Sequence, residues 1–442
     1  MEIIGGKVSL RQIFLCRRAW LVFWTANILR LRWAIVWNVA RMLLCRTGWG
    51  HQEYRCRRCG TTRRVPHTCK SRFCSSCGKA AVDRWVETTL SAILDVSYQH
   101  LVFTIPRELR DWIRMNRKAA LNALFRAVKD PLLTWTRQRG YRPGLISVLH
   151  TFGADLKWNP HIHVIITCGG ISLDETRWLE NRYLPWQCLK PMYRYAFLRE
   201  LKKLFRSGEL KTPPAHQRIR TCESFNSYLT QFYKKEWYVH LGKSLKDADF
   251  TIRYVGRYGK RPVIAESRIT AFDGRAVTFR YQDRATGEDT SMTLPVQEFI
   301  GRLVTHIPDQ NFRCLRHAGI FANRVRTEKL EKARRLLGQN PKPAPQRISW
   351  REMFRNTFDH DPLECPRCGD IMQLTGVTFV RSIDIRLRVL GRHRELKNCH
   401  VTKTRAKQES QTAKAKGEKT SRRPFAARAP PQARRHLSLS TV

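Results

Sequence analysis

The chain has 442 residues, of which 42% are hydrophobic, so it can bury sizeable cores in two or three domains. Its 82 Lys and Arg residues against 36 Asp and Glu residues give a formal net charge of +46, and a chain this basic repels itself unless a polyanion screens it. Nucleic acid is therefore the expected partner, with an anionic membrane surface as the weaker alternative. Five of the 14 cysteines lie within residues 56–77, with no secretory signal before them, which favours metal binding in a reducing cytoplasm over a disulfide framework.

Residues 1–50 contain two apolar stretches, at 19–29 and 33–40, which arginines interrupt and flank. Neither stretch reaches the roughly 20 apolar residues that a membrane-spanning helix needs. Early arginines without a small-residue cleavage site argue against a signal peptide. The pattern predicts a helical amino-terminal segment, with two helices that pack on the next domain.

Residues 51–90 carry two C-x-x-C pairs, which predict a small zinc domain because four thiolates complete a tetrahedral shell in a segment with little core of its own. Basic residues lie between the cysteines, so we expect this domain to bind DNA. The expected zinc ligands are Cys56, Cys59, Cys74 and Cys77. Cys69, His67 and His51 are further candidates, for a different fourth ligand or for a second ion, and Arg72 is an expected DNA contact.

Residues 95–325 alternate predicted strands and helices, which indicates an α+β domain with a mixed or antiparallel sheet. Strands are expected at 100–105, 145–152 and after Pro160, and the last two form an antiparallel hairpin around the loop at 153–160. The second hairpin strand carries His161 and His163. Because side chains alternate along a strand, both imidazoles project from one face and can hold a divalent metal with positions left open for a substrate.

The hairpin also suggests a third metal ligand. If its loop centres between Leu156 and Lys157, His150 lies opposite His163, where directly paired side chains are close. His150 is therefore the expected third ligand. Asp155 is the alternative, since carboxylates suit a hard ion such as Mg²⁺.

Tyr254 and Tyr258 lie four residues apart, a spacing that places both hydroxyls on one face of a helix. A tyrosine oxygen can attack phosphorus and form a covalent phosphotyrosine. Positive charge around the pair suits a phosphate backbone. We expect Tyr254 and Tyr258 to be catalytic, Lys260 to steady the phosphate, and three arginines to contact DNA: Arg253, Arg257 and Arg261.

The carboxy-terminal part divides at residue 400. Residues 326–400 are predicted to form a basic helix, a proline-rich linker and a second cysteine knuckle at Cys365 and Cys368, for which only Cys399 and His400 offer ligands nearby in the sequence. Residues 401–442 are rich in Lys and Arg and poor in apolar residues, as in a disordered basic tail. The chain contains no G-x-x-x-x-G-K-[ST] motif, so we expect no nucleotide triphosphate to be used.

Three motifs follow one another along the chain: a multi-cysteine module, His-Ile-His at 161–163 and Tyr-Val-Gly-Arg-Tyr at 254–258. In that order the chain resembles the two-tyrosine HUH transposases of the insertion-sequence-ninety-one family. The resemblance covers roughly residues 40–325 and extends to further matching stretches: residues 65–74, 150–160 and 261–265. Residues 16–35 depart from the polar, charged segment that the family shows there.

The resemblance implies a ferredoxin-like HUH palm, with an antiparallel sheet and helices, preceded by a zinc-binding domain that recognises the ends of the element. It also implies a metal-dependent endonuclease and strand transferase that uses Mg²⁺ or Mn²⁺ at the histidine pair, with a third ligand that varies in the family. Such an enzyme cleaves and rejoins single-stranded DNA at the element ends and the target through a 5′-phosphotyrosine, in rolling-circle DNA transposition.

Two alternatives remain on the sequence alone. A rolling-circle replication initiator or relaxase would use the same chemistry but does not usually carry the multi-cysteine module. A non-catalytic zinc-dependent DNA-binding protein would have the same charge and cysteine pairs, and its tyrosines would serve only in packing.

Overall fold

The computed structural model describes residues 8–241, 252–253, 262–283, 286–340 and 349–380. Its centre is a five-stranded sheet in which every neighbouring pair is antiparallel. The order of the strands is β13 (Leu315–Gly319), β5 (Gly144–Phe152), β6 (Trp158–Thr167), β3 (Tyr98–Thr104) and β9 (Val239–Leu241). The α+β class and the antiparallel sheet expected from the sequence are confirmed.

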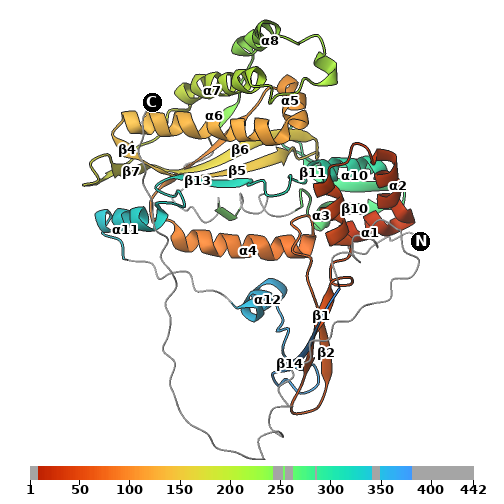
Figure 1. Ribbon diagram of the computed structural model, residues 1–442. Helices are drawn as coiled ribbons and strands as arrows, with labels where there is room; N and C mark the ends of the chain where they lie inside the picture. The colour runs from red at the N-terminus through yellow and green to blue at the C-terminus, as the bar shows by residue number, and fades with distance from the viewer. Residues whose placement is uncertain (1–7, 242–251, 254–261, 284–285, 341–348, 381–442) are drawn as a thin grey trace, which may run out of the picture.

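One face of this sheet is covered by helices, as Figure 1 shows. These helices are α5 (Arg110–Met115), α6 (Arg117–Gln138), α7 (Trp186–Arg206) and α8 (Cys222–Lys234), with η2 (Arg107–Leu109) and η3 (Pro214–His216) in their connections. Alternate strand residues such as Leu149, Ile162 and Val164 point into this layer and are buried against Leu124 and Phe197. The largest core therefore lies between the apolar face of the sheet, formed by alternate strand residues, and the apolar faces of the helices.

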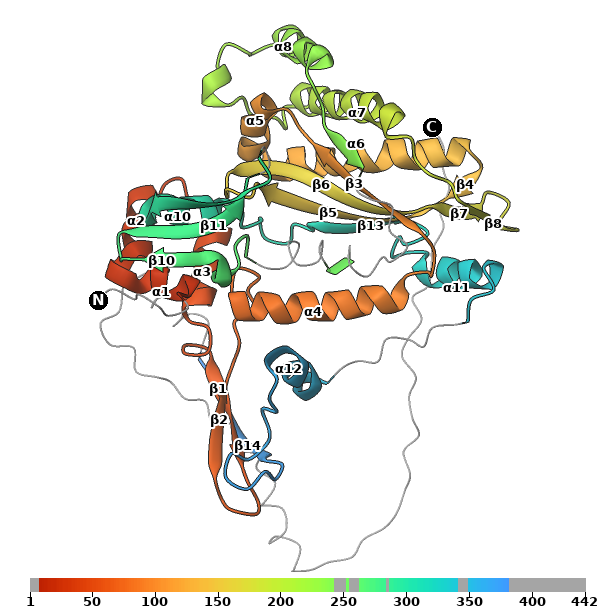
Figure 2. The same cartoon turned by 180° about the vertical axis from the view of Figure 1, so that it is seen from behind.

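The opposite face of the sheet packs on α4 (Ser75–Ala92) and α11 (Arg326–Leu336), which lie below it in both views (Figures 1 and 2). The strand residues Ile146, Val148 and Ile165 belong to this layer, and so does Ile252. A small sheet flanks it, in the order β4 (Tyr141–Arg142), β7 (Gly169–Ser172) and β8 (Trp178–Glu180).

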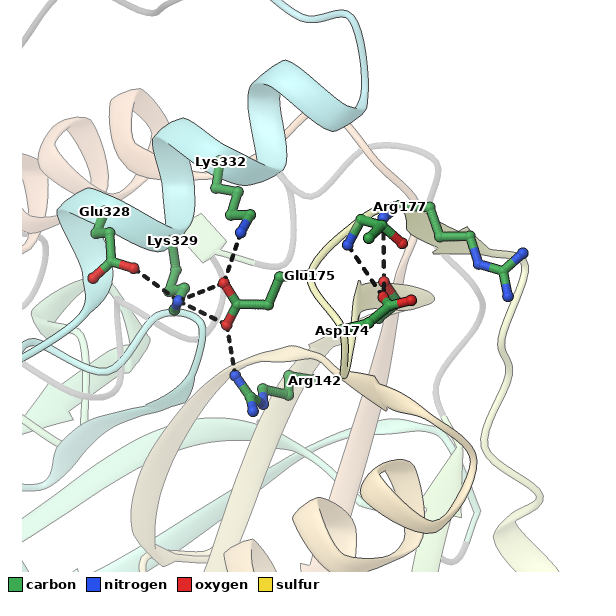
Figure 3. A network of polar contacts seen from close by, with 9 residues as sticks. Arg142, Asp174, Glu175, Arg177, Glu328, Lys329 and Lys332 are labelled. Carbon is green, nitrogen blue, oxygen red and sulfur yellow. Dashed lines mark hydrogen bonds and ion pairs between the residues drawn. The ribbon is translucent and has the colours of Figure 1, made fainter.

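An ion-pair network holds α11 against the turn between β7 and β8 (Figure 3). The carboxylate of Glu175 accepts from Lys329 at 2.8 Å, Lys332 at 2.8 Å and Arg142 at 2.8 Å. Hydrogen bonds from Lys329, followed by Lys332, lower the pKa of Glu175 to about 2. The turn therefore keeps its charge and its hold on α11 down to strongly acidic pH.

The amino-terminal segment packs on a part of the chain that is distant in sequence. Three α-helices form, rather than the two expected: α1 (Leu10–Leu15), α2 (Ala19–Asn27) and α3 (Trp33–Leu43), with η1 (Cys16–Arg18) between the first two. Their apolar faces share a core with residues of β10 (Ile269–Phe272), β11 (Ala276–Gln282), β12 (Asp289–Pro295) and α10 (Val296–Thr305). The two apolar stretches lie only partly inside this core: Trp20, Ile35 and Val39 are buried, whereas several large apolar side chains stay exposed, namely Leu21, Val22, Ile28, Leu29 and Trp33. No helix among the described residues is both long and apolar enough to cross a membrane.

A narrow three-stranded sheet projects away from these layers (Figures 1 and 2). Its strands, in order, are β14 (Gln373–Phe379), β1 (Gly50–Arg55) and β2 (Thr62–Pro66), all antiparallel. The helix α12 (Trp350–Phe358) lies between this sheet and α4. Residues 50–66 and residues 373–379, which are far apart in the sequence, thus meet in one sheet.

Candidate active site and cysteine clusters

Three histidines gather on the α4 side of the central sheet. His161 and His163 project from β6, and His150 projects from the neighbouring strand β5. One side-chain nitrogen from each lies within 4.8 Å of the others, and all three side chains are buried. Three imidazoles that converge from rigid strands form a donor set suited to a divalent metal.

The pairing of the hairpin differs from the sequence prediction. His150 lies opposite His161, and Val148 lies opposite His163. The expected pairing of His150 with His163 was wrong because the turn centres on Asp155 rather than between Leu156 and Lys157: Phe152 pairs with Trp158, and the N–H of Gly153 donates to the carbonyl of Lys157 at 3.0 Å. An irregularity between His150 and Phe152 then shifts the pairing by one residue. All three imidazoles still share one face, and the ring centres of His150 and His163 are 4.1 Å apart.

Asp155, the alternative third ligand, lies in the hairpin loop rather than in the histidine cluster. Its carboxylate accepts from the backbone N–H of Lys157 at 3.1 Å and pairs with the Lys157 ammonium at 3.2 Å. Among the described residues, the histidine whose ligand nitrogen lies within 4.8 Å of those of both His161 and His163 is His150.

Hydrogen bonds fix the orientation of the two strand histidines. The ring nitrogen Nδ1 of His161 lies 2.7 Å from the carbonyl oxygen of Asn159. A carbonyl only accepts, so this nitrogen carries the proton and Nε2 stays available to a metal. Nδ1 of His163 lies 2.8 Å from Nε2 of His100, on β3. Burial, followed by the charge of His240, lowers the pKa of His100 to about 4, which keeps it neutral and able to accept this bond.

His100 is a functional candidate that the sequence did not reveal. It lies in β3 as a single histidine in an apolar strand, and no motif marks it. Only the antiparallel pairing of β3 with β6, which places Val102 opposite His163, brings His100 beside His163.

Most of the tyrosine segment lies outside the described residues, including Tyr254, Tyr258, Lys260, Arg257 and Arg261. Its described beginning is Ile252 and Arg253. Ile252 is fully buried with Ile146, Val148 and Ile165, on the same side of the sheet as the histidines, while Arg253 is exposed.

The six cysteines between residues 45 and 77 do not form one group. Cys69, Cys74 and Cys77 lie with Cys45, which follows α3, and the four sulfurs are within 4.8 Å of one another. The sulfurs of Cys69 and Cys77 are 3.6 Å apart, and those of Cys45 and Cys77 are 3.8 Å apart. A tetrahedron with Zn–S bonds of about 2.3 Å has edges of about 3.8 Å, so this cluster has the spacing of a zinc site.

Cys56 and Cys59 belong to a second cluster, with Cys365 and Cys368. The expectation that Cys56 and Cys59 share an ion with Cys74 and Cys77 was therefore wrong. The reason is that β1 and β2 carry the first pair away from the second along the projecting hairpin. Cys399 and His400, the nearby candidates for completing the second knuckle, lie outside the described residues.

Two further predicted residues have different surroundings. At the base of the hairpin, Nδ1 of His67 lies 3.1 Å from the carbonyl oxygen of Trp49, so this nitrogen is protonated and donates to it. Arg72, an expected DNA contact, is half-buried, and its guanidinium lies 3.4 Å from the sulfur of Cys314. Arg72 thus points into the junction between the layers.

Comparison with known proteins agrees with this geometry. A family model described as "Putative transposase" matches residues 144–329, which hold the histidine strands. A second, described as "Transposase zinc-binding domain", matches residues 16–105. No solved structure matches the chain.

Two relatives match most of the chain. The transposase for insertion sequence element IS801 from Pseudomonas savastanoi pv. phaseolicola is 32% identical over 88% of this chain and 95% of its own length. A protein of Sinorhizobium fredii strain NBRC 101917 / NGR234, named "Putative transposase y4qJ", is 32% identical over 75% of this chain and 86% of its own length.

The fold and the two kinds of site define a zinc-binding DNA transposase. The chain belongs to the insertion-sequence-ninety-one (IS91) family of transposases. Its partner is accordingly DNA, as its charge of +46 indicates.

Proposed function

We propose that this transposase cleaves and rejoins single-stranded DNA at the ends of its element through a 5′-phosphotyrosine, in rolling-circle transposition. The observation that carries the proposal is the cluster of His150, His161 and His163, buried on one face of an antiparallel sheet. The proposal assigns this cluster to Mg²⁺ or Mn²⁺.

The three imidazoles would hold the ion through nitrogens that the surrounding hydrogen bonds leave unprotonated. A divalent ion bound there supplies a Lewis acid that polarises the scissile phosphate. Asn159 and His100 act as positioning residues, because each engages the far nitrogen of a strand histidine. Three nitrogen ligands suit Mn²⁺ better than Mg²⁺. Phosphate oxygens of the bound DNA would supply the oxygen ligands that both ions favour.

The tyrosine segment would supply the nucleophile. The oxygen of Tyr254 or Tyr258 attacks phosphorus and loses its proton, the bond between phosphorus and the 3′ oxygen breaks, and that oxygen leaves as a 3′-hydroxyl. The transesterification conserves the phosphodiester energy, so joining needs no nucleotide triphosphate. The burial of Ile252 in the layer below the histidines supports this role, because Tyr254 follows Ile252 by two residues.

Lys260, Arg257, Arg261 and Arg253 would neutralise the DNA backbone near the reacting phosphate. Zinc held by Cys45, Cys69, Cys74 and Cys77 would fix the start of α4 to the end of α3, since the cluster joins these two helices. Such a structural ion would orient the amino-terminal domain for recognition of the element ends.

The proposal is tested by searching for a covalent protein–DNA adduct on a denaturing gel. Purified protein is mixed with labelled single-stranded DNA from the element ends, with Mn²⁺, Mg²⁺ or EDTA. We expect a metal-dependent adduct that Tyr254→Phe with Tyr258→Phe abolishes and that His161→Ala with His163→Ala reduces to background. Tight DNA binding by folded, zinc-loaded protein without any adduct would instead identify a non-catalytic binding protein.

A further inference from the structure

The second cysteine cluster joins two parts of the chain that are about three hundred residues apart in sequence. The sulfurs of Cys56 and Cys368 are 3.5 Å apart, and so are those of Cys59 and Cys365 and of Cys59 and Cys368. These distances are far above the roughly 2.05 Å of a disulfide and close to the edge of a tetrahedral zinc–thiolate shell. The cluster therefore fits an ion and does not fit a covalent pair of bridges.

The two C-x-x-C segments have the same local structure. In the first, the N–H of Cys56 donates to the carbonyl of Thr61 at 2.9 Å, and the N–H of Gly60 donates to the carbonyl of Cys56 at 3.1 Å. In the second, Cys365 donates to Asp370 at 2.8 Å, and Gly369 donates to Cys365 at 2.9 Å. Both bonds thus join the same relative positions in each segment.

The glycine after each pair has the same role. Gly60 and Gly369 have φ values of +70° and +75°, in the left-handed region that favours glycine. This turn brings both sulfurs of a pair to one side. Two such turns that face each other present four thiolates to a common centre, which is the arrangement of a zinc ribbon.

The strands next to the knuckles complete the ribbon. The second knuckle runs directly into β14, which pairs antiparallel with β1 from Gly50 opposite Phe379 to Arg55 opposite Gln373. The apolar core under the three strands consists of little more than Tyr54, Val65 and Met372 beside the cysteines. A core this small needs a crosslink to be stable, and a structural metal supplies one.

We propose that Cys56, Cys59, Cys365 and Cys368 bind one Zn²⁺ and so close a zinc ribbon whose two knuckles come from opposite parts of the chain. This site is separate from the cluster of Cys45, Cys69, Cys74 and Cys77, and it does not depend on the strand-transfer chemistry proposed above. The ion anchors the segment after α12 to the hairpin β1–β2.

The test is the zinc content of full-length protein, measured by inductively coupled plasma mass spectrometry. We expect two zinc ions per wild-type chain and one in Cys365→Ser with Cys368→Ser. The variant with Cys56→Ser and Cys59→Ser should lose the same ion. A fourfold variant, which carries all four serine substitutions, should therefore also retain one ion. Cys188→Ser with Cys222→Ser is the matched control, which should retain two, because neither cysteine belongs to a cluster.

A ligand exchange separates loss of a ligand from misfolding. Cys368→His should retain two ions, since three cysteines and one histidine also make a structural zinc site. Hydrogen exchange should rise in β1 and β14 of both pair variants and stay unchanged in β5 and β6. Two results would overturn the shared site. One is two zinc ions in the variant without Cys365 and Cys368, and the other is one ion fewer in the fourfold variant than in either pair variant. Loss of both ions from either pair variant would do the same.

Discussion

The Nε2 atom of His100 on β3 lies 2.8 Å from the Nδ1 atom of His163 on β6, and the two rings are nearly parallel, at 16°. This contact fixes the ring of His163 and its tautomer from the side opposite Nε2, the nitrogen proposed to hold the metal. Such outer contacts affect metal affinity without touching the ion.

We therefore expect His100→Ala to weaken Mn²⁺ binding by roughly 10- to 100-fold while the protein stays folded. His100→Gln, whose side-chain oxygen can accept from Nδ1–H of His163, should recover part of that loss. The measurement is Mn²⁺ titration followed by electron paramagnetic resonance, with circular dichroism as the folding control. Equal affinity in wild type and both variants would remove His100 from the site.

The third ligand can be tested by a pair of alanine variants on the same hairpin. His150→Ala should reduce both Mn²⁺ affinity and adduct yield by at least about tenfold, because it removes a direct donor. Asp155→Ala should leave both unchanged, since its carboxylate contacts Lys157 in the loop. Calorimetric titration with Mn²⁺ would decide between them, and the reverse pattern would move the ligand to Asp155.

Cys45 has no C-x-x-C partner in the sequence, yet it lies with Cys69, Cys74 and Cys77. Cys45→Ser should lower the zinc content by one ion per chain and lower the melting temperature. The physical reason is that the ion joins α3 to the start of α4, so its loss frees two packed elements. Cys188→Ser, at an exposed cysteine, provides the comparison. Unchanged zinc content in Cys45→Ser would contradict the four-cysteine site.

A groove of about 670 Å³ lies between the hairpin β1–β2 and α12, and basic and aromatic side chains line it. Arg64 and Lys70 come from the amino-terminal side, and Trp350 comes from α12. Cations beside an exposed aromatic ring suit a DNA strand.

We expect Arg64→Gln and Lys70→Gln each to weaken DNA binding and to reduce the slope of log affinity against log salt by roughly 0.7 to 0.9. Arg137→Gln, at an exposed position near the end of α6, serves as the control and should leave the slope unchanged. Fluorescence anisotropy at several salt concentrations would measure this, and equal slopes in all variants would place the DNA elsewhere.

His306 links α10 to the loop of the histidine hairpin. Its Nε2 lies 3.0 Å from the carbonyl of Leu156, so it donates there, and Nδ1 accepts from the hydroxyl of Thr151 at 3.0 Å. Burial lowers the pKa of His306 to about 4. The neutral ring is therefore the form that the fold accommodates.

Because this folded-state pKa lies below the usual 6.5, the contribution to stability is complete above about pH 6.5 and falls as the pH drops towards 4. The full shift corresponds to roughly 3 kcal/mol. His306→Gln should lower stability at pH 8, and its deficit against wild type should shrink as the pH is lowered to 5. Urea unfolding at several pH values measures both curves, and a constant deficit would contradict the assignment.

The sequence predicted the local elements well where one periodicity dominated. The basic helix expected at the start of residues 326–400 is present as α11 (Arg326–Leu336). The same-face placement of His161 and His163 followed from strand geometry alone. The register of the hairpin did not follow, because the loop turns around Asp155, one to two residues earlier than expected, with Leu156 at a left-handed φ of +64° and buried in another core.

By itself, the sequence determined the chemistry that this protein has available: paired histidines, cysteine knuckles, a tyrosine pair and an excess of positive charge. Local spacing carries this information, since it decides which side chains share a strand, a turn or a helix face. Only the tertiary structure decided which of these groups meet. Cys56 and Cys59 lie with Cys365 and Cys368, and Cys45 joins the other knuckle, because strand pairing between distant segments outweighs proximity in sequence. His100 reaches His163 for the same reason, since β3 and β6 are neighbours in the sheet and not in the chain.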